Sequence, residues 1–113
     1  MSWRLLTGWK YLDGTQGMPD SVKQLSGRVV EIAGYLIPIQ DSELLLIESP
    51  ATLATCDSEI NQLVHVTLTQ VPADALLGRK VKVTGSFKVG ATYLDGYCVD
   101  VYRLRAHEVQ VIQ

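Results

Sequence analysis

Cysteine, charge and long apolar runs are all scarce in this 113-residue sequence, and each shortage excludes a class of protein. Two cysteines, Cys56 and Cys98, are too few for a small domain built on a disulfide framework. No apolar stretch approaches the roughly 18 residues that a membrane-spanning helix needs. Only 19% of the residues are charged and 47% are hydrophobic, which excludes a disordered chain and predicts a single domain with its own core.

The first residues also lack the apolar centre of a secretory signal peptide, because Gly8, Lys10 and Asp13 interrupt it. If the chain is complete as given, we therefore expect it in the cytoplasm. A net charge of −2 argues against a dedicated binder of duplex DNA, since such proteins are usually basic. The glycine patterns of phosphate and dinucleotide loops are missing as well.

Apolar residues recur at every second position in much of the chain, which is the period of a strand with one buried face. The predicted strands are 29–37, 44–47, 63–68, 80–89 and 98–105, followed by a tail strand over 108–112. The second of these is an unbroken apolar run, as in a strand that is buried on both sides.

Short helices and loops are predicted between the strands. Residues 20–25 suit a short helix with Asp20 as its N-cap, and 72–77 suit one or two helical turns. A loop is predicted over 90–96. The alternation of the fifth strand slips between residues 101 and 104, which indicates a bulge.

The order of three strands, a short helix and two strands is the order of an OB-type barrel. We therefore predict an all-β fold, a five-stranded OB-like closed barrel over residues 25–113 with the short helix between strands three and four. Gly34 and Gly85 lie in mid-strand, where they would let long strands coil sharply. Residues 1–24, which contain two tryptophans, are predicted to be an N-terminal extension that packs on the barrel.

Five segments spread over nearly the whole chain carry a family resemblance. They are Trp9 with Leu12; 25–28 (Leu-Ser-Gly-Arg) with 34–38 (Gly-Tyr-Leu-Ile-Pro); 43–48; Cys56 with 61–66 (Asn-Gln-Leu-Val-His-Val); and 96–98 (Gly-Tyr-Cys) with 101–104 (Val-Tyr-Arg-Leu). Together they resemble the bacterial family of domains of unknown function numbered 3299. Because many members of that family look exported or lipid-anchored, the resemblance implies a periplasmic or envelope setting. It supplies no chemistry.

OB barrels bind their ligands on the face of strands two and three, flanked by the first and last loops between strands. The residues predicted for that face are Glu48, Asn61, Gln62, His65, Tyr93 and Tyr97. The predicted function is a non-enzymatic binding or adaptor module, without a cofactor, that contacts a protein partner or a small ligand.

A single-stranded nucleic-acid-binding OB domain is the alternative. One sector of the sequence is mildly basic, with Arg79, Lys80, Lys82, Lys88, Arg103 and Arg105 against Asp95 and Asp100. This sector suits either a solvated strand face or an anion-binding face. Strands two and three, however, carry no aromatic or basic side chain other than His65, and single strands bind by base stacking in a basic groove.

The second alternative is a metal-binding domain that uses cysteine and histidine. Cys56, His65, Cys98 and His107 could supply four zinc ligands, but eight residues separate Cys from His in each pair, which is not a zinc-finger spacing. Cys56 and His65 could also be written as a hydrolase pair, yet nothing marks a nucleophile elbow. We expect instead that Cys56 and Cys98 form a thiol pair or a disulfide, because strands three and five of an OB barrel lie side by side and run parallel.

Overall fold

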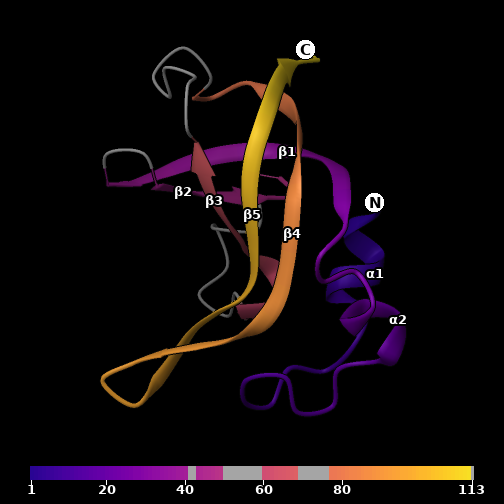
Figure 1. The fold of residues 1–113 in the computed structure, drawn as a ribbon. Helices are drawn as coiled ribbons and strands as arrows, with labels where there is room; N and C mark the ends of the chain where they lie inside the picture. The colour runs from indigo at the N-terminus through magenta and orange to yellow at the C-terminus, as the bar shows by residue number, and fades with distance from the viewer. Residues whose placement is uncertain (41–42, 50–59, 69–76, 113) are drawn as a thin grey trace.

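A computed structural model of the chain describes residues 1–40, 43–49, 60–68 and 77–112. Its elements are α1 (Trp3–Thr7), α2 (Asp20–Lys23), β1 (Val29–Gln40), β2 (Glu43–Ile47), the 3-10 helix η1 (Ile60–Gln62), β3 (Val64–Leu68), β4 (Lys80–Leu94) and β5 (Tyr97–Val111) (Figure 1). Within these ranges no helix has the length and apolar character needed to cross a membrane.

The five strands form one closed barrel in the order β1-β2-β3-β5-β4. The barrel closes because β1 is long enough to serve two neighbours: it pairs with β4 over residues 29–35 and with β2 over 35–40. β3 and β5 run parallel, with Val66 opposite Leu104, and the other pairs are antiparallel. The predicted mainly β architecture, with five strands in one ring and the third beside the fifth, is confirmed.

Alternation decides which side chains fill the barrel. The inward residues of β1 and β4, each at most 9% exposed, are Val30, Ile32, Leu36, Val81, Val83 and Phe87. Gly34 and Gly85 share this inward phase, and each lies where backbone approaches backbone. A Cβ on Gly34 would meet the carbonyl oxygen of Ile47, and one on Gly85 would meet that of Arg105. Only glycine therefore permits the close crossings that curl the sheet.

The N-terminal segment adds its own apolar side chains to this core. Trp3, Leu6, Trp9, Met18 and Val22 are buried in one cluster with the inward residues of the strands. Burying a large apolar side chain contributes roughly 1.5–3 kcal/mol, so this segment supplies a sizeable share of the apolar stabilisation.

The sequence predicted the helices of this segment incompletely. α1 was not predicted; Ser2 caps it, since its hydroxyl accepts from the Leu5 amide at 3.4 Å. The predicted N-cap Asp20 is wrong, because Pro19 occupies that position and Asp20 lies inside the first turn of α2. The helix predicted over 72–77 falls outside the described residues, except Leu77, which is in a turn.

The loop predicted over 90–96 is wrong as well. β4 continues to Leu94 and β5 begins at Tyr97, so only Asp95 and Gly96 form the turn, with φ of 53° and 84°. Asp-Gly favours a two-residue hairpin turn in which both residues have positive φ. The result is a long β4–β5 hairpin that projects beyond the barrel at the lower left of Figure 1.

The pairing of β4 with β5 contains several irregularities. One faces Val101, because Val89 pairs with Tyr102 and Thr92 with Asp100. Here the extra residue is on β4, and β5 pairs in continuous register from Tyr102 to Ala106, so the bulge predicted between residues 101 and 104 of the fifth strand is wrong. Another makes His107 an extra residue on β5, so the predicted tail strand is the continuation of β5 rather than a separate element.

Candidate ligand-binding groove

His65 lies on the outer face of β3, between Leu45 of β2 and Arg103 of β5 in the pairing register. Its side chain is 13% exposed, and its Nε2 is 4.0 Å from Oε2 of Glu43. Its Nδ1 is buried and has no hydrogen-bond partner among the described residues. A buried polar atom without a hydrogen bond destabilises the folded state. The Nδ1 of His65 is therefore a group on the outer face of β3 that a ligand could satisfy.

An open groove of about 380 Å³ surrounds this histidine, and we call it the His65 groove. It is lined by Glu43, Leu45, Leu63, His65, Leu94, Val99, Asp100 and Arg103. Four of these are aliphatic and four carry a polar group. An apolar lining with a few convergent polar groups is the usual composition of a ligand site.

Arg103 is held in place at one edge of the groove. Its Nε and Nη2 donate to Oδ1 and Oδ2 of Asp100 at 3.1 and 3.0 Å. Asp100 is 3% exposed, whereas the side chain of Arg103 remains 43% exposed. A two-point pair of this kind fixes the plane of the guanidinium, so its three remaining N–H donors keep defined directions.

The β4–β5 hairpin forms another wall of the groove, and its two faces have different roles. On one face the Tyr93 hydroxyl donates to Oδ1 of Asp13 at 3.3 Å. On this side the pKa of Tyr11 is raised to about 12, mainly by burial and secondly by a hydrogen bond with the Cys98 thiol. The N-terminal segment therefore contacts this face through Tyr11 and Asp13, and the phenol of Tyr11 stays protonated at neutral pH.

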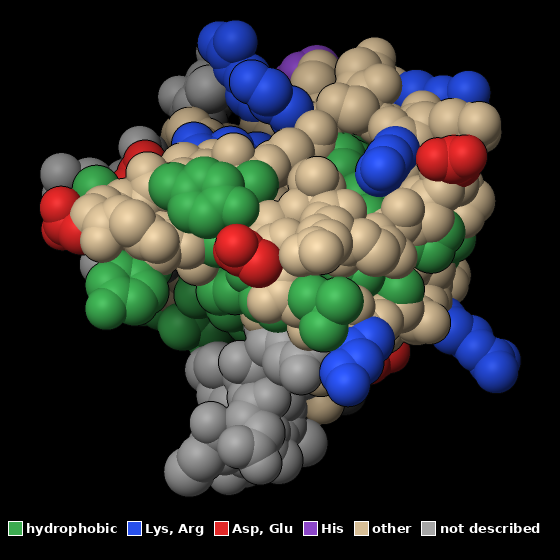
Figure 2. Space-filling model, turned by 90° about the horizontal axis from the view of Figure 1, so that it is seen from below, with side chains coloured by type: hydrophobic (Ala, Val, Ile, Leu, Met, Phe, Trp, Pro, Cys, Tyr) green, Lys and Arg blue, Asp and Glu red, His purple; other side chains and the backbone are tan. Residues whose placement is uncertain are grey.

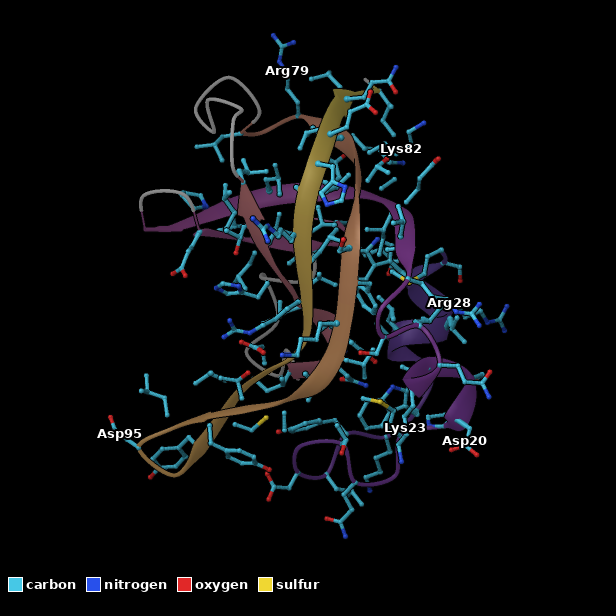
Figure 3. All side chains as sticks on the ribbon, viewed as in Figure 1. Asp20, Lys23, Arg28, Arg79, Lys82 and Asp95 are labelled. Carbon is cyan, nitrogen blue, oxygen red and sulfur yellow. The ribbon has the colours of Figure 1, made fainter. Side chains whose placement is uncertain are left out.

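The other face of the hairpin looks toward the groove. Leu94 and Val99 line the groove while remaining 64% and 40% exposed. Figure 2 views the molecule from below and shows hydrophobic side chains at the left of this underside, and Figure 3 marks the tip of the hairpin at Asp95. The hairpin is thus supported on one face and leaves an apolar surface open on the other.

The structure separates most of the residues predicted for the ligand face. Only His65 lines the groove. Tyr93 points to the opposite face of the hairpin, and Tyr97, 77% exposed, is at its tip. Glu48 is exposed just beyond the end of β2, away from Glu43 at its start.

The remaining two predicted residues belong to η1. Asn61 is 1% exposed, and its Nδ2 donates to the carbonyl of Trp9 at 2.9 Å, which ties η1 to the N-terminal segment. Gln62 is half-buried beside it. Sequence reasoning missed Leu94 and Val99, although the Asp-Gly pair at 95–96 was a signal for the hairpin that carries them.

Cysteine and histidine are dispersed in the described part of the chain. Cys98 is half-buried, and its Sγ donates to the carbonyl of Asp100 at 3.5 Å. His107 lies against Ser86, with 3.3 Å between Nε2 and Oγ. No three His, Cys, Asp or Glu side chains of the described ranges are grouped as metal ligands. Cys56 lies outside those ranges, so its contact with Cys98 stays a prediction.

The barrel and the His65 groove define a small, mainly β domain with a ligand-type groove on its outer face. A crystal structure of a DUF3299 family protein from Pseudomonas aeruginosa PAO1 is similar to it, with a TM-score of 0.62 and 25% sequence identity over 80% of this chain. This similarity confirms the resemblance to the DUF3299 family. The match spans 65% of that protein's chain. No family model and no curated protein matches the sequence.

Proposed function

We propose that this protein is a non-enzymatic binding or adaptor module on an OB-type barrel, and that the His65 groove receives an apolar segment of a protein partner. The strand order, with β1 closing on β4 and β3 parallel to β5, supports the OB assignment. The observation that carries the proposal is the groove itself, which combines aliphatic side chains with a fixed guanidinium and an imidazole whose buried Nδ1 has no hydrogen-bond partner among the described residues.

The hairpin favours a protein partner over a small ligand. Leu94 and Tyr97 are 64% and 77% exposed beside the groove, so the apolar surface continues past the groove's rim. Exposed apolar surface with a polar rim is typical of a protein interaction site. An apolar side chain of the partner would enter between Leu63 and Leu94, and a carbonyl at its edge would meet the Arg103 guanidinium.

A binding role fits the lining better than catalysis does. Two of the described polar groups have little access to a ligand, because Asp100 is 3% exposed and bound to Arg103, and the side chain of His65 is 13% exposed. The envelope setting implied by the family resemblance is part of the proposal, and it would place the partner in that compartment.

Site-specific photo-crosslinking in the source bacterium tests the proposal. A benzophenone amino acid replaces Leu94, and the matched control replaces Val29, which is 65% exposed and lies outside the groove lining. We expect one discrete protein adduct from position 94 and none from position 29. Identical adducts from both positions, or no protein adduct from position 94, would overturn the protein-partner reading.

A further inference from the structure

A second hollow lies on the outer face of the barrel, beside the His65 groove, and differs from it in charge. It has a volume of about 380 Å³ and is lined by Thr67, Ser86, Phe87, Lys88, Arg103, Leu104 and Arg105. An adjoining hollow of about 220 Å³ shares Lys88 and Arg103 with it and continues over Gly90. We call Lys88, Arg103 and Arg105 the basic row.

The pairing register concentrates positive charge along this row. Lys88 of β4 stands directly opposite Arg103 of β5, and Arg105 follows two residues later on the same face. Like charges directly opposite each other destabilise an antiparallel pair. The ion pair of Arg103 with Asp100 offsets part of this repulsion, and a bound anion would offset more of it.

Among the described residues, Arg103 is the one member of the basic row with a carboxylate partner. Asp100 engages two of the five N–H donors of Arg103 and leaves the two on Nη1 and one on Nη2. Among the described residues, no carboxylate lies within 4.0 Å of Lys88 or Arg105. Lys82 on the same strand differs, because its Nζ is 3.6 Å from Oε2 of Glu31.

Hydroxyl groups complete a donor-rich surface around the row. Ser86, whose Oγ also lies 3.3 Å from Nε2 of His107, is paired with Arg105 across β4–β5, and Thr67 is paired with Arg105 across β3–β5. Guanidinium, ammonium and hydroxyl groups together match the oxygens of a tetrahedral anion. We propose that the basic row binds the phosphate or sulfate group of a small molecule, at a site that shares Arg103 with the His65 groove but is otherwise lined by different residues.

The same hollow is poorly suited to a nucleic-acid strand. Its one aromatic side chain, Phe87, is 1% exposed and cannot stack on a base. The cations are confined to one short row, which suits a single anionic group.

Titration by NMR, at constant ionic strength adjusted with sodium chloride, tests this site. The probes are inorganic phosphate and glucose 6-phosphate, added to the full chain. The test variant is Lys88→Gln/Arg105→Gln, and the matched control is Lys82→Gln, an outward lysine on the same strand. Thermal unfolding of each variant verifies that the exposed substitutions leave the fold intact.

We expect saturable shifts of the amides around residues 86–88 and 103–105 for at least one probe. Binding should weaken at least tenfold in the double variant and remain unchanged in Lys82→Gln. Stronger binding of glucose 6-phosphate would identify a phosphate ester as the ligand class, and equal binding would identify the free anion. Non-saturating shifts, equal loss in Lys82→Gln, or preferred binding of a ten-nucleotide oligothymidylate would overturn the proposal.

Failure of this test is separable from failure of the proposed function. The crosslinking experiment depends on Leu94, which does not line the basic hollow, and the anion titration depends on Lys88 and Arg105, which do not line the His65 groove.

Discussion

The indole Nε1 of Trp9 donates a hydrogen bond to the Tyr102 hydroxyl at 2.9 Å, joining the N-terminal segment to β5 across 93 positions of sequence. The same hydroxyl donates to the carbonyl of Leu6 at 2.7 Å, so it is satisfied on both sides. Tyr102 is fully buried and stacks on Phe87 with ring centroids 5.7 Å apart. One phenol thus fixes how the N-terminal segment packs on the barrel.

Removing this hydroxyl should destabilise the fold without disturbing its surface. In Tyr102→Phe the indole N–H and the Leu6 carbonyl lose their partner inside the core, at a cost of about 1–3 kcal/mol. Urea unfolding at pH 7 measures the loss. Tyr97→Phe, which alters an exposed phenol, is the control, and an unchanged Tyr102→Phe would show that the network contributes little.

Deprotonation of Tyr102 should lower the free energy of unfolding at alkaline pH. Burial raises the pKa of Tyr102 from 10.0 to about 12, although the hydrogen bond from Trp9 lowers it in part. The unfolded chain therefore releases this proton first, so the stabilisation is complete below pH 10 and is lost as pH rises toward 12. The total effect is about 2–3 kcal/mol. Unfolding free energies from pH 9 to 12 should fall less steeply in Tyr102→Phe; parallel curves would refute the assignment.

The close crossings of the sheet make a prediction for three glycines. Gly34→Ala and Gly85→Ala would each place a Cβ against a backbone carbonyl, which forces a strand shift and costs roughly 1–3 kcal/mol on the overpacking scale. Gly90→Ala is the control, because nothing lies within 4 Å of its Cβ position. Thermal unfolding should separate the first two variants from the third; equal midpoints for all three would contradict the crossings.

Oxidation tests the predicted neighbour relation of Cys56 and Cys98. If the two sulfurs lie close together, oxidised glutathione should convert the monomer to an intramolecular disulfide. Closing that loop would stabilise the fold by roughly 4 kcal/mol on the chain-entropy account. Thiol titration and mass spectrometry without reduction follow the reaction. Disulfide-linked dimers, or two thiols that survive oxidation, would show that the sulfurs lie apart.

Much of the barrel was predictable because period-two alternation is a local signal. It located the inward residues of β1 and β4, and mid-strand Gly34 and Gly85 marked the crossings. The groove was not predictable in the same way, since it depends on how far the hairpin reaches and which face it turns toward β3. Bulges in β4 and β5 set that geometry, and they left Leu94 facing the groove while Tyr93 turned to Asp13.

The long-range polar contacts could not be predicted from the sequence either. Nothing local in the positions of Trp9, Asn61 or Tyr102 shows that they meet, because each contact follows from the packing of residues 1–24 on the barrel. The same segment contacts the hairpin where the Tyr93 hydroxyl donates to Oδ1 of Asp13.

The most direct test of the account is a titration of the crosslinked partner, once purified, against three forms of the protein. These are the wild type, Leu94→Asp in the groove, and Val29→Asp at a position of matched exposure outside its lining. Isothermal calorimetry should show at least tenfold weaker binding for Leu94→Asp and unchanged binding for Val29→Asp, because a carboxylate in the apolar lining opposes an apolar ligand. Equal affinity for all three forms would contradict binding in the His65 groove.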